Sequence, residues 1–305
     1  MAILNTADLA PAQKTWLRNV YLGLPQSFTD AGQQYPRQID TRELFKLLEI
    51  KKVETKRREI EAKWIPKFAQ IFKYAAGEVS DNYRLSHSVD AALRSVDAYL
   101  HGHLVEAFQN LYYETEVVFM RRAKLQLRRK SIFGPDEQKD DQWDIVDPYD
   151  VPPMQAWNRK VTAVKIANVR DSTKRRVQDI VSQGLEDGLS VDNIAKNIMK
   201  SAHFGWDRAK LIAQTEVVSA SNAANHFSIG ANMSTRGMTK AWASAGDRRV
   251  RPSHADADAT QVDIPYNEPF TVGGSQLMFP GDGSLGAPGR ETIRCRCTAL
   301  YYPGR

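Results

Sequence analysis

The stretch from residue 247 to residue 297 begins DRRVRPSH (247–254), continues through PFTVGG (269–274) and PGDGS (280–284), and ends in CRC (295–297). Gly and Pro interrupt it often, and no helical periodicity runs through it. Both cysteines of the chain lie in its last three residues. This stretch decides the fold, because it adds a loop-rich end with strands to a chain whose upstream part is mostly helical in pattern.

Two segments in and around this stretch alternate with a period of two, at residues 239–244 and more clearly at 291–302. Such alternation predicts strands. In the second strand, side chains at every other position share one face, so Ile293, Cys295, Cys297 and Ala299 are expected on the same side. Both thiols therefore point the same way. The many Gly and Pro residues between the two strands predict a long ordered loop or a set of short strands.

Three helices are expected immediately upstream. Asp171 or Ser172 caps the first, Ser190 caps the second, and the third begins near Trp206 and runs through Phe227. The third helix carries a polar stripe at steps of four and seven, formed by Arg208, Thr215, Ser219, Asn222 and His226. This stripe is either the solvated side of the helix or a contact surface, and its small, hydrogen-bonding members leave both interpretations open.

The remaining sequence divides into three segments. Residues 1–40 are rich in Pro, Gln and Gly and predict an N-terminal arm, and residues 41–133 show long apolar stripes at helical spacing. Residues 134–155 are acidic and contain Pro, which predicts an exposed linker. We therefore expect an α+β protein with a helical domain at 41–133 and, at 156–305, a domain of about three helices followed by a small mixed or antiparallel sheet with long loops.

Ten residues at the end of the helical domain, 121–130, are rich in Lys and Arg and contain no acidic residue; we call them the cationic decade. Its basic residues are Arg121, Arg122, Lys124, Arg128, Arg129 and Lys130. The acidic linker that follows can neutralise this charge, which is the simpler interpretation. The alternative is contact with the phosphates of double-stranded DNA, which the net charge of +6 over 305 residues permits without requiring.

Composition excludes several classes. No apolar run approaches the roughly 18 residues of a membrane span, and the first residues lack the basic start and apolar middle of a signal peptide. We therefore expect no membrane partner and a location in the cytoplasm of the cell that makes the protein. Two cysteines one residue apart are also unlike the framework of a disulfide-rich secreted domain.

His254, Cys295 and Cys297 offer ligands that suit zinc, and Asp247 offers a fourth. A single residue between the cysteines differs from the usual zinc knuckle, in which two residues intervene. The preferred interpretation is therefore that both thiols are buried side by side without a metal or another cofactor.

A catalytic interpretation rests on a different combination. His254 with Asp247, Arg249 and Glu216 could form an acid/base set that acts on phosphodiesters. No nucleophile elbow, phosphate loop or metalloprotease motif accompanies it. In the structural alternative, Asp247 and Arg249 pair to fix the loop and His254 bonds to backbone, and this non-enzymatic interpretation is preferred.

A series of motifs follows along the second half of the chain: RAKLIAQTE (208–216), Asn222, Trp242, Asp247, Arg249, His254, Pro269-Phe270, Pro280-Gly281-Asp282, Ala287-Pro288, Glu291 and Cys295-Arg296-Cys297. Taken in order, these residues resemble the phage Mu F-like minor head protein family, also called head morphogenesis or minor capsid proteins. The resemblance covers roughly residues 160–302, and two positions depart from it: Gln214 where the family usually has arginine, and Arg294 where it often has asparagine.

The resemblance implies a structural protein of the inner head of a tailed-phage virion, present in a few copies. It further implies association with portal, scaffolding or major capsid protein during procapsid assembly, and a role that extends to DNA packaging or ejection. Site residues implied in this way hold the domain together: Arg208, Thr215, Glu216, Asn222, Asp247, Arg249, His254, Cys295 and Cys297. The alternative remains a nuclease-like or other catalytic domain on a helical carrier.

Overall fold

A computed structural model of the chain describes residues 41–131 and 147–302. They belong to two compact units, Met1–Val53 and Glu54–Arg305. Of the first unit, residues 41–53 are described, and they form the beginning of helix α2 (Thr41–Ser86). The expected arm at 1–40 and most of the expected linker, up to residue 146, lie outside the described residues.

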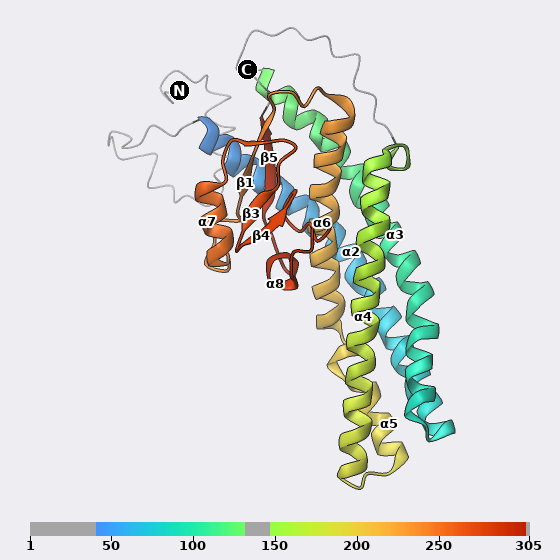
Figure 1. Cartoon of the computed structure of the whole chain (residues 1–305). Coiled ribbons are helices and arrows are strands. Elements are labelled where there is room, and N and C mark those ends of the chain that lie inside the picture. Colours follow the sequence, from blue (N-terminus) through green and yellow to red (C-terminus); the bar gives the residue numbers. More distant parts are fainter. Residues whose placement is uncertain (1–40, 132–146, 303–305) are drawn as a thin grey trace, which may run out of the picture. The chain divides into compact units, whose positions relative to one another are not determined.

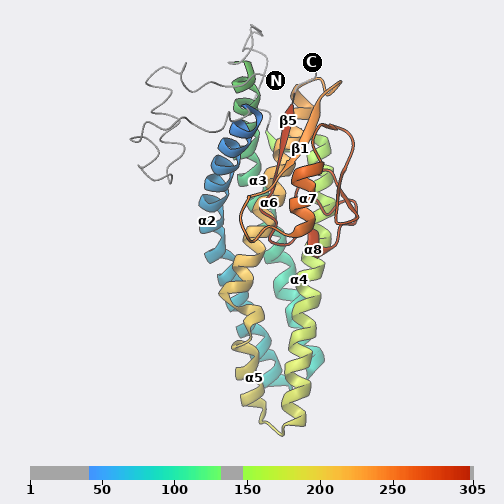
Figure 2. The same ribbon diagram turned by 90° about the vertical axis from the view of Figure 1, so that its left-hand side faces the viewer.

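Long helices dominate the second unit (Figures 1 and 2). After α2 come α3 (Val89–Ser131), the 3₁₀ turn η4 (Pro148–Asp150), α4 (Pro152–Glu186), α5 (Val191–Met199), η5 (Ala202–Phe204) and α6 (Trp206–Asn232). The expected apolar stripes form the core, as Phe68 of α2 and Phe108 of α3 show by packing edge to face, 5.7 Å between ring centroids. Among the described helices, none has both the length and the apolarity that crossing a membrane requires.

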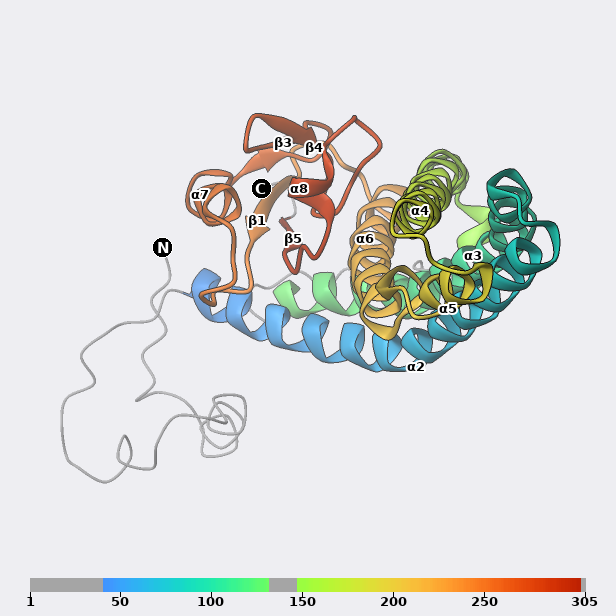
Figure 3. The same ribbon diagram turned by 90° about the horizontal axis from the view of Figure 1, so that it is seen from below.

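Helix α6 lies at the centre of the second unit, between the strands on one side and α3 and α4 on the other (Figure 3). Almost every residue from Ala209 to Ile229 is buried, and many of them are Ala or Ser, which lets neighbouring backbones approach closely. The polar stripe is a contact surface, because Thr215, Ser219, Asn222 and His226 are all buried. The start of this helix and the cap of α5 by Ser190 agree with the sequence prediction.

The strands form a small antiparallel sheet in the order β2–β1–β5, comprising β1 (Thr239–Ala243), β2 (Ile264–Pro265) and β5 (Thr298–Tyr302). In the central pair, Trp242 lies opposite Ala299. A separate hairpin joins β3 (Phe270–Val272) to β4 (Ser275–Leu277), and two short helices, α7 (Pro252–Thr260) and α8 (Gly289–Thr292), complete the loop region. The expected α+β class is confirmed, and the sheet is antiparallel.

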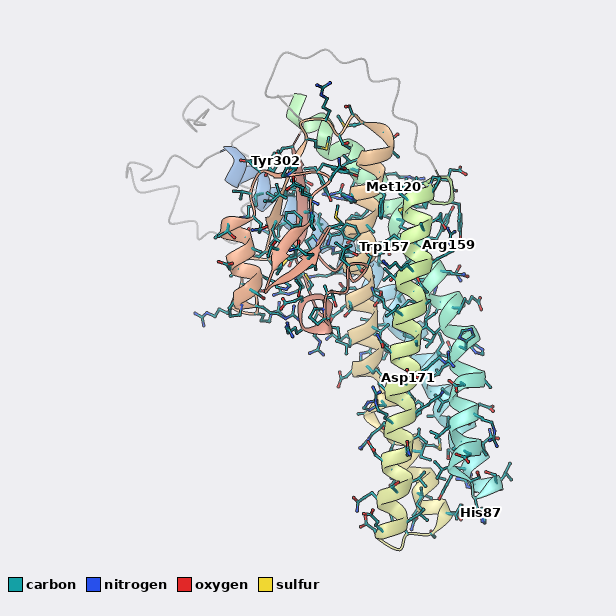
Figure 4. The ribbon with its side chains drawn as sticks, viewed as in Figure 1. His87, Met120, Trp157, Arg159, Asp171 and Tyr302 are labelled. Atoms are coloured by element: carbon teal, nitrogen blue, oxygen red, sulfur yellow. The ribbon has the colours of Figure 1, made fainter. Side chains whose placement is uncertain are left out.

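One expected helix start is wrong. Helix α4 runs without a break from Pro152 to Glu186, and Asp171 lies in its middle (Figure 4). Ser172 does not cap a helix, because its hydroxyl donates back to the carbonyl oxygen of Asn168 at 2.7 Å, within the same helix. The N-terminal end carries Pro at the first helical positions, where the missing N–H costs nothing.

The last strand is also shorter than predicted. Residues 289–292 are helical, and Arg294 has a positive φ of 54°, which the extended chain of a strand does not allow. Pairing with β1 begins only at Thr298. Cys295 and Cys297 therefore lie in the turn before β5, and their alternation along a strand was the wrong reason for expecting their thiols to point the same way.

Candidate functional site

A cluster of sulfur and nitrogen atoms forms where α7 meets the turn before β5. His254 Nδ1 lies 3.4 Å from Cys297 Sγ and 3.7 Å from Cys295 Sγ. All three side chains are buried, and their ligand atoms lie within 4.8 Å of one another. The thiols thus point the same way, as predicted, and Nδ1 of the histidine that sequence reasoning grouped with them lies close to both. These three residues could hold a metal ion.

Glu291 extends the cluster on the opposite side of the imidazole ring. Its Oε2 atom lies 3.2 Å from His254 Nε2 and accepts a hydrogen bond from the Ser253 hydroxyl at 3.0 Å. Glu291 is buried, and the Gly273 backbone lies so close that a Cβ there would sit 2.5 Å from Glu291 Oε1. Sequence reasoning named Glu291 only as part of the family pattern. The signal that could have identified it is an acid placed four residues before a cysteine pair.

The two thiols share their protons unequally. A hydrogen bond with Cys297 lowers the pKa of Cys295 well below its ordinary value, and the same bond raises the pKa of Cys297. A buried cation lies nearby: Arg57 donates to the carbonyl oxygen of Cys297 at 3.1 Å and to the Ser221 hydroxyl at 2.8 Å. Burial lowers the pKa of Arg57 to about 10, and the guanidinium favours a thiolate beside it.

Asp247 belongs to a different, exposed arrangement. Both of its carboxylate oxygens accept hydrogen bonds from Arg296, at 2.5 and 2.6 Å, and Arg249 adds its backbone N–H at 2.9 Å and its guanidinium at 3.2 Å. The bidentate bond from Arg296 lowers the pKa of Asp247 well below its ordinary value. The expected Asp247–Arg249 pair is present, but Arg296 makes the shorter contacts. Asp247 is not part of the metal-competent group of His254 and the two cysteines.

Glu216 lies in a third environment, where α3, α4 and α6 meet. Its Oε2 atom accepts hydrogen bonds from Lys165 at 2.5 Å and from the Tyr112 hydroxyl at 2.6 Å. Lys165 also donates to Ser219 at 3.1 Å, so one buried network connects the three helices. Burial, and next the charge of Glu216, raise the pKa of Tyr112 well above its ordinary value.

The residues of the predicted catalytic set are therefore engaged separately. His254 contacts the thiols and Glu291, Asp247 contacts two arginines, and Glu216 contacts Lys165 and Tyr112. The hydrogen bonds of each acid are made with structural neighbours instead of with His254. The Asp247–Arg249 pair of the structural interpretation is present, but the His254 ring contacts side chains instead of the backbone that this interpretation expected. The choice between a structural and a catalytic role stays a prediction.

Other residues of the family pattern also hold the fold. Arg208 donates to the carbonyl oxygen of Val169 at 3.0 Å, which joins α6 to α4, and the Thr215 hydroxyl accepts the backbone N–H of Arg294 at 3.2 Å. Arg294 has the left-handed backbone conformation in which asparagine is the enriched residue among those with a side chain. The asparagine that the family often has at this position suits the left-handed backbone. We therefore interpret the difference between arginine and asparagine here as one of backbone conformation and not of a reactive group.

The cationic decade lies at the end of α3. Arg121 is exposed, whereas the side chains from Lys124 onward, including those of Arg128, Arg129 and Lys130, lie outside the described residues. The acidic linker that would neutralise them is also largely outside that part of the chain. DNA contact by this segment stays a prediction.

Sequence reasoning missed several cations that are buried or largely buried, among them Arg57 and Lys165. Both carry a signal: Arg57 stands seven residues before Trp64, and Lys165 stands four after Val161, so each lies on the apolar face of its helix. A charged residue on such a face requires a buried partner. The partners, the turn at Cys297 and Glu216, come from distant segments and were not deducible from helix periodicity.

The comparison with protein families concerns this same part of the chain. The family model described as Phage Mu protein F like protein matches residues 175–300. The uncharacterized protein YqbB of Bacillus subtilis (strain 168) is 30% identical over 148 residues, which make up 47% of this chain and 45% of YqbB. The NAD(+)–arginine ADP-ribosyltransferase EFV of Enterococcus faecalis (strain ATCC 700802 / V583) is 25% identical over 142 residues, 45% of this chain and 27% of that enzyme. No solved structure matched.

The chain thus spans less than half the length of either curated relative. The matched range contains α5, α6, the sheet and the cluster around His254, and it includes the residues on which the resemblance was based. Several of these residues, such as Asn222, His254 and Cys297, make buried contacts between α6 and the loop-rich end, whereas Asp247 and Arg249 are exposed. Residues 175–300 match the family described as Phage Mu protein F like protein, in agreement with the resemblance that the motifs carry.

Proposed function

We propose that this protein is a structural minor capsid protein that acts in head morphogenesis of a tailed bacteriophage and associates with portal and procapsid during assembly. The observation that carries the proposal is the family match over residues 175–300. It agrees with the environments of the family residues, which bind one another and backbone groups of the fold. Location in the inner head of the virion, with assembly in the host cytoplasm, belongs to the same proposal.

The hydrogen bonds of Asp282 and Ser219 support a structural role for the family pattern. Asp282 is buried and accepts hydrogen bonds from Trp157 Nε1 at 2.9 Å and from two backbone N–H groups of its own loop. Ser219 donates to the carbonyl oxygen of Gly281 at 2.7 Å. These bonds fix the PGDGS loop on α6 and α4 and satisfy its buried polar groups, which is the role expected of structural residues.

The test is to locate the protein in assembling particles. The full chain is coexpressed with the portal and major capsid proteins of the same genome, and procapsids are separated from free protein by sedimentation. We expect the protein to sediment with procapsids and to copurify with portal protein. Absence from both fractions, with the protein folded and soluble, would contradict the proposal.

A catalytic role is the second candidate, because a relative bears the name of an ADP-ribosyltransferase. We assign that activity to the part of the relative that this chain does not cover, which is 73% of its length (100 − 27). Purified protein incubated with RNA, DNA, and NAD plus arginine should therefore leave all of them unchanged. Nucleic-acid cleavage that His254→Ala abolishes would favour the nuclease-like alternative.

Association with double-stranded DNA through the cationic decade is a separate part of the proposal. The charges predict affinity that falls steeply with salt, by roughly one power of the salt concentration for each phosphate neutralised. A variant with Arg121, Arg122, Lys124, Arg128, Arg129 and Lys130 changed to Gln is compared with the wild type by fluorescence anisotropy on duplex DNA. Identical affinities of the variant and the wild type at every salt concentration would show that this segment does not bind DNA.

A further inference from the structure

The cluster of His254, Cys295 and Cys297 has the dimensions of a metal site. A zinc ion bound tetrahedrally at about 2.3 Å from sulfur and about 2.0 Å from nitrogen separates two sulfur ligands by about 3.8 Å and a sulfur from a nitrogen by about 3.5 Å. The observed distances from Nδ1 to the two sulfurs are 3.4 and 3.7 Å, and the three ligand atoms lie within 4.8 Å of one another. We propose that these three side chains bind one zinc ion.

The hydrogen bonds of His254 orient it as a ligand. Its Nδ1 atom faces the thiols, while Nε2 lies 3.2 Å from the buried Glu291 carboxylate. A proton on Nε2 donated to Glu291 leaves the lone pair of Nδ1 for the metal, and a carboxylate on the far nitrogen is the usual support of a metal-bound histidine. Trp242 packs edge to face on the imidazole, 5.4 Å between ring centroids, and restricts its rotation.

The charges of the site balance with zinc. Zinc binds both cysteines as thiolates, and each thiol proton still present leaves for solvent, so the ion with two thiolates and a neutral imidazole carries no net charge. Two thiolates buried without a metal would have the buried cation Arg57 beside them, one positive charge against two negative charges. Among the described residues, the group has three members, and the fourth position of the tetrahedron is left to water.

The ligands come from two separate segments. His254 lies on α7, and the cysteines lie about forty residues later in the turn before β5. Because both cysteines are free thiols, no disulfide ties this turn down. A zinc ion would cross-link α7 to the start of β5 and stabilise the loop-rich end without an oxidising environment.

Metal content of the full chain is the direct test. The protein is produced in zinc-supplemented medium, purified without chelator, and analysed by mass spectrometry for metal per chain. We expect about one zinc in the wild type and in His103→Ala, an exposed histidine bonded within its own helix, and below about 0.1 in His254→Ala. A wild-type ratio below about 0.1 after zinc is added back would overturn the proposal.

Because His254→Ala can also unfold the domain, cobalt gives a second readout on the wild type. Co²⁺ titrated into metal-free protein should produce, at one equivalent, a thiolate-to-metal charge-transfer band and the visible bands of tetrahedral cobalt, and zinc should abolish both. Folding is followed in the same samples by circular dichroism. A folded protein without these bands would also overturn the site.

Two adjacent glycines test the role of Glu291. Gly273 and Gly274 both have positive φ, 57° and 77°, so alanine strains the hairpin in either place. A Cβ at Gly273 would meet Glu291 Oε1 at 2.5 Å, whereas nothing lies within 4 Å at Gly274. We expect Gly273→Ala to weaken zinc binding by about 10- to 100-fold relative to Gly274→Ala. Equal affinities would overturn the orienting role of Glu291.

Discussion

Asn222 shows how one buried amide can join three segments. Its Nδ2 group donates to the carbonyl oxygens of Pro280 at 2.9 Å and Cys297 at 3.1 Å, and its Oδ1 accepts the backbone N–H of Ala299 at 3.2 Å. Each bond links α6 to a loop or strand of the other end of the unit. Since the side chain is buried, water cannot replace these partners, and their loss leaves unsatisfied groups.

We therefore predict that Asn222→Ala lowers the free energy of unfolding by about 2–4 kcal/mol. Asn232→Ala is the matched control, because the hydrogen bond that the Asn232 side chain makes among the described residues goes to the Ser228 carbonyl oxygen of its own helix. Its cost should be below about 1 kcal/mol. Chemical denaturation followed by circular dichroism measures both, and equal losses would show that the bonds across segments contribute little.

Glu116 is a buried acid whose ionisation should destabilise the protein. Burial raises its pKa to about 8, a hydrogen bond with Asn158 opposes the shift, and Oε1 has no hydrogen-bond partner among the described residues. With a folded pKa above the unfolded value of 4.5, its stabilising effect is complete below about pH 4.5 and is lost as pH rises to about 8. Each unit by which the folded pKa differs from the unfolded pKa changes the free energy of unfolding by about 1.4 kcal/mol.

The variant Glu116→Gln should remove this pH dependence. It cannot ionise, so we expect its melting temperature to exceed that of the wild type at pH 8 by more than at pH 5. Glu106→Gln, an exposed position on the same helix, serves as the control and should follow the wild type at both pH values. A constant difference between Glu116→Gln and the wild type across this range would mean that Glu116 is already ionised in the folded protein.

At the scale of elements, the network of Glu216, Lys165 and Tyr112 joins α3, α4 and α6. Both charged side chains are largely buried, with 17% of Lys165 and 6% of Glu216 exposed. Removing one partner of such a pair leaves an uncompensated buried charge. Lys165→Met should therefore cost about 3 kcal/mol, and adding Glu216→Gln should recover part of that loss.

The exposed ion pair between Lys63 and Glu114, also interhelical at 2.8 Å, provides the comparison. Lys63 is 55% exposed, and solvent screens the pair, so Lys63→Met should cost below about 1 kcal/mol. Urea denaturation of the single and double variants gives the coupling energy. Equal costs for Lys165→Met and Lys63→Met would show that burial of the Lys165 network has no energetic consequence.

How far the sequence predicts these elements depends on the range of the interaction. The start of α6 at Trp206 and the cap of α5 by Ser190 are local, because each depends on residues next to the turn that follows, and both could be predicted. The start of β5 is not local. It depends on the left-handed Arg294 and on Asn222, which binds the carbonyl oxygen of Cys297 from another helix. Alternation with a period of two indicates neither the backbone conformation of Arg294 nor the hydrogen bond from Asn222.

The candidate site likewise has features that the sequence predicts and features that depend on distant segments. Its three ligand types could be identified from the sequence, but the single residue between the cysteines suggested that no ion was held. The structure supplies the third ligand from α7 and the supporting carboxylate from α8. Tertiary packing sets these distances, and spacing within a motif carries no information about them.

At the scale of the whole molecule, the sequence-based division places 41–133 and 156–305 in separate domains, whereas the structure assigns Glu54–Arg305 to one compact unit. Helix α3 supplies Tyr112, which donates a hydrogen bond to the buried Glu216. Helix α2 supplies Arg57, which donates to the carbonyl oxygen of Cys297. A fragment of residues 156–305 would lose these partners and expose the apolar face of α6. Exposed apolar area and unpaired buried groups both reduce stability.

We therefore predict that the fragment 156–305 does not fold into a stable domain, while 54–305 unfolds in one cooperative transition. Calorimetry measures the cooperativity of unfolding of both fragments, and the dispersion of amide proton chemical shifts in NMR spectra shows whether each is folded. The full chain is the reference. Because the family match lies within 156–305, the comparison also determines whether the Mu F-like segment depends on the helices before it. A cooperative transition of 156–305 at the temperature of the longer fragment would show instead that the family segment is an independent domain, with α2 and α3 as a separate attachment.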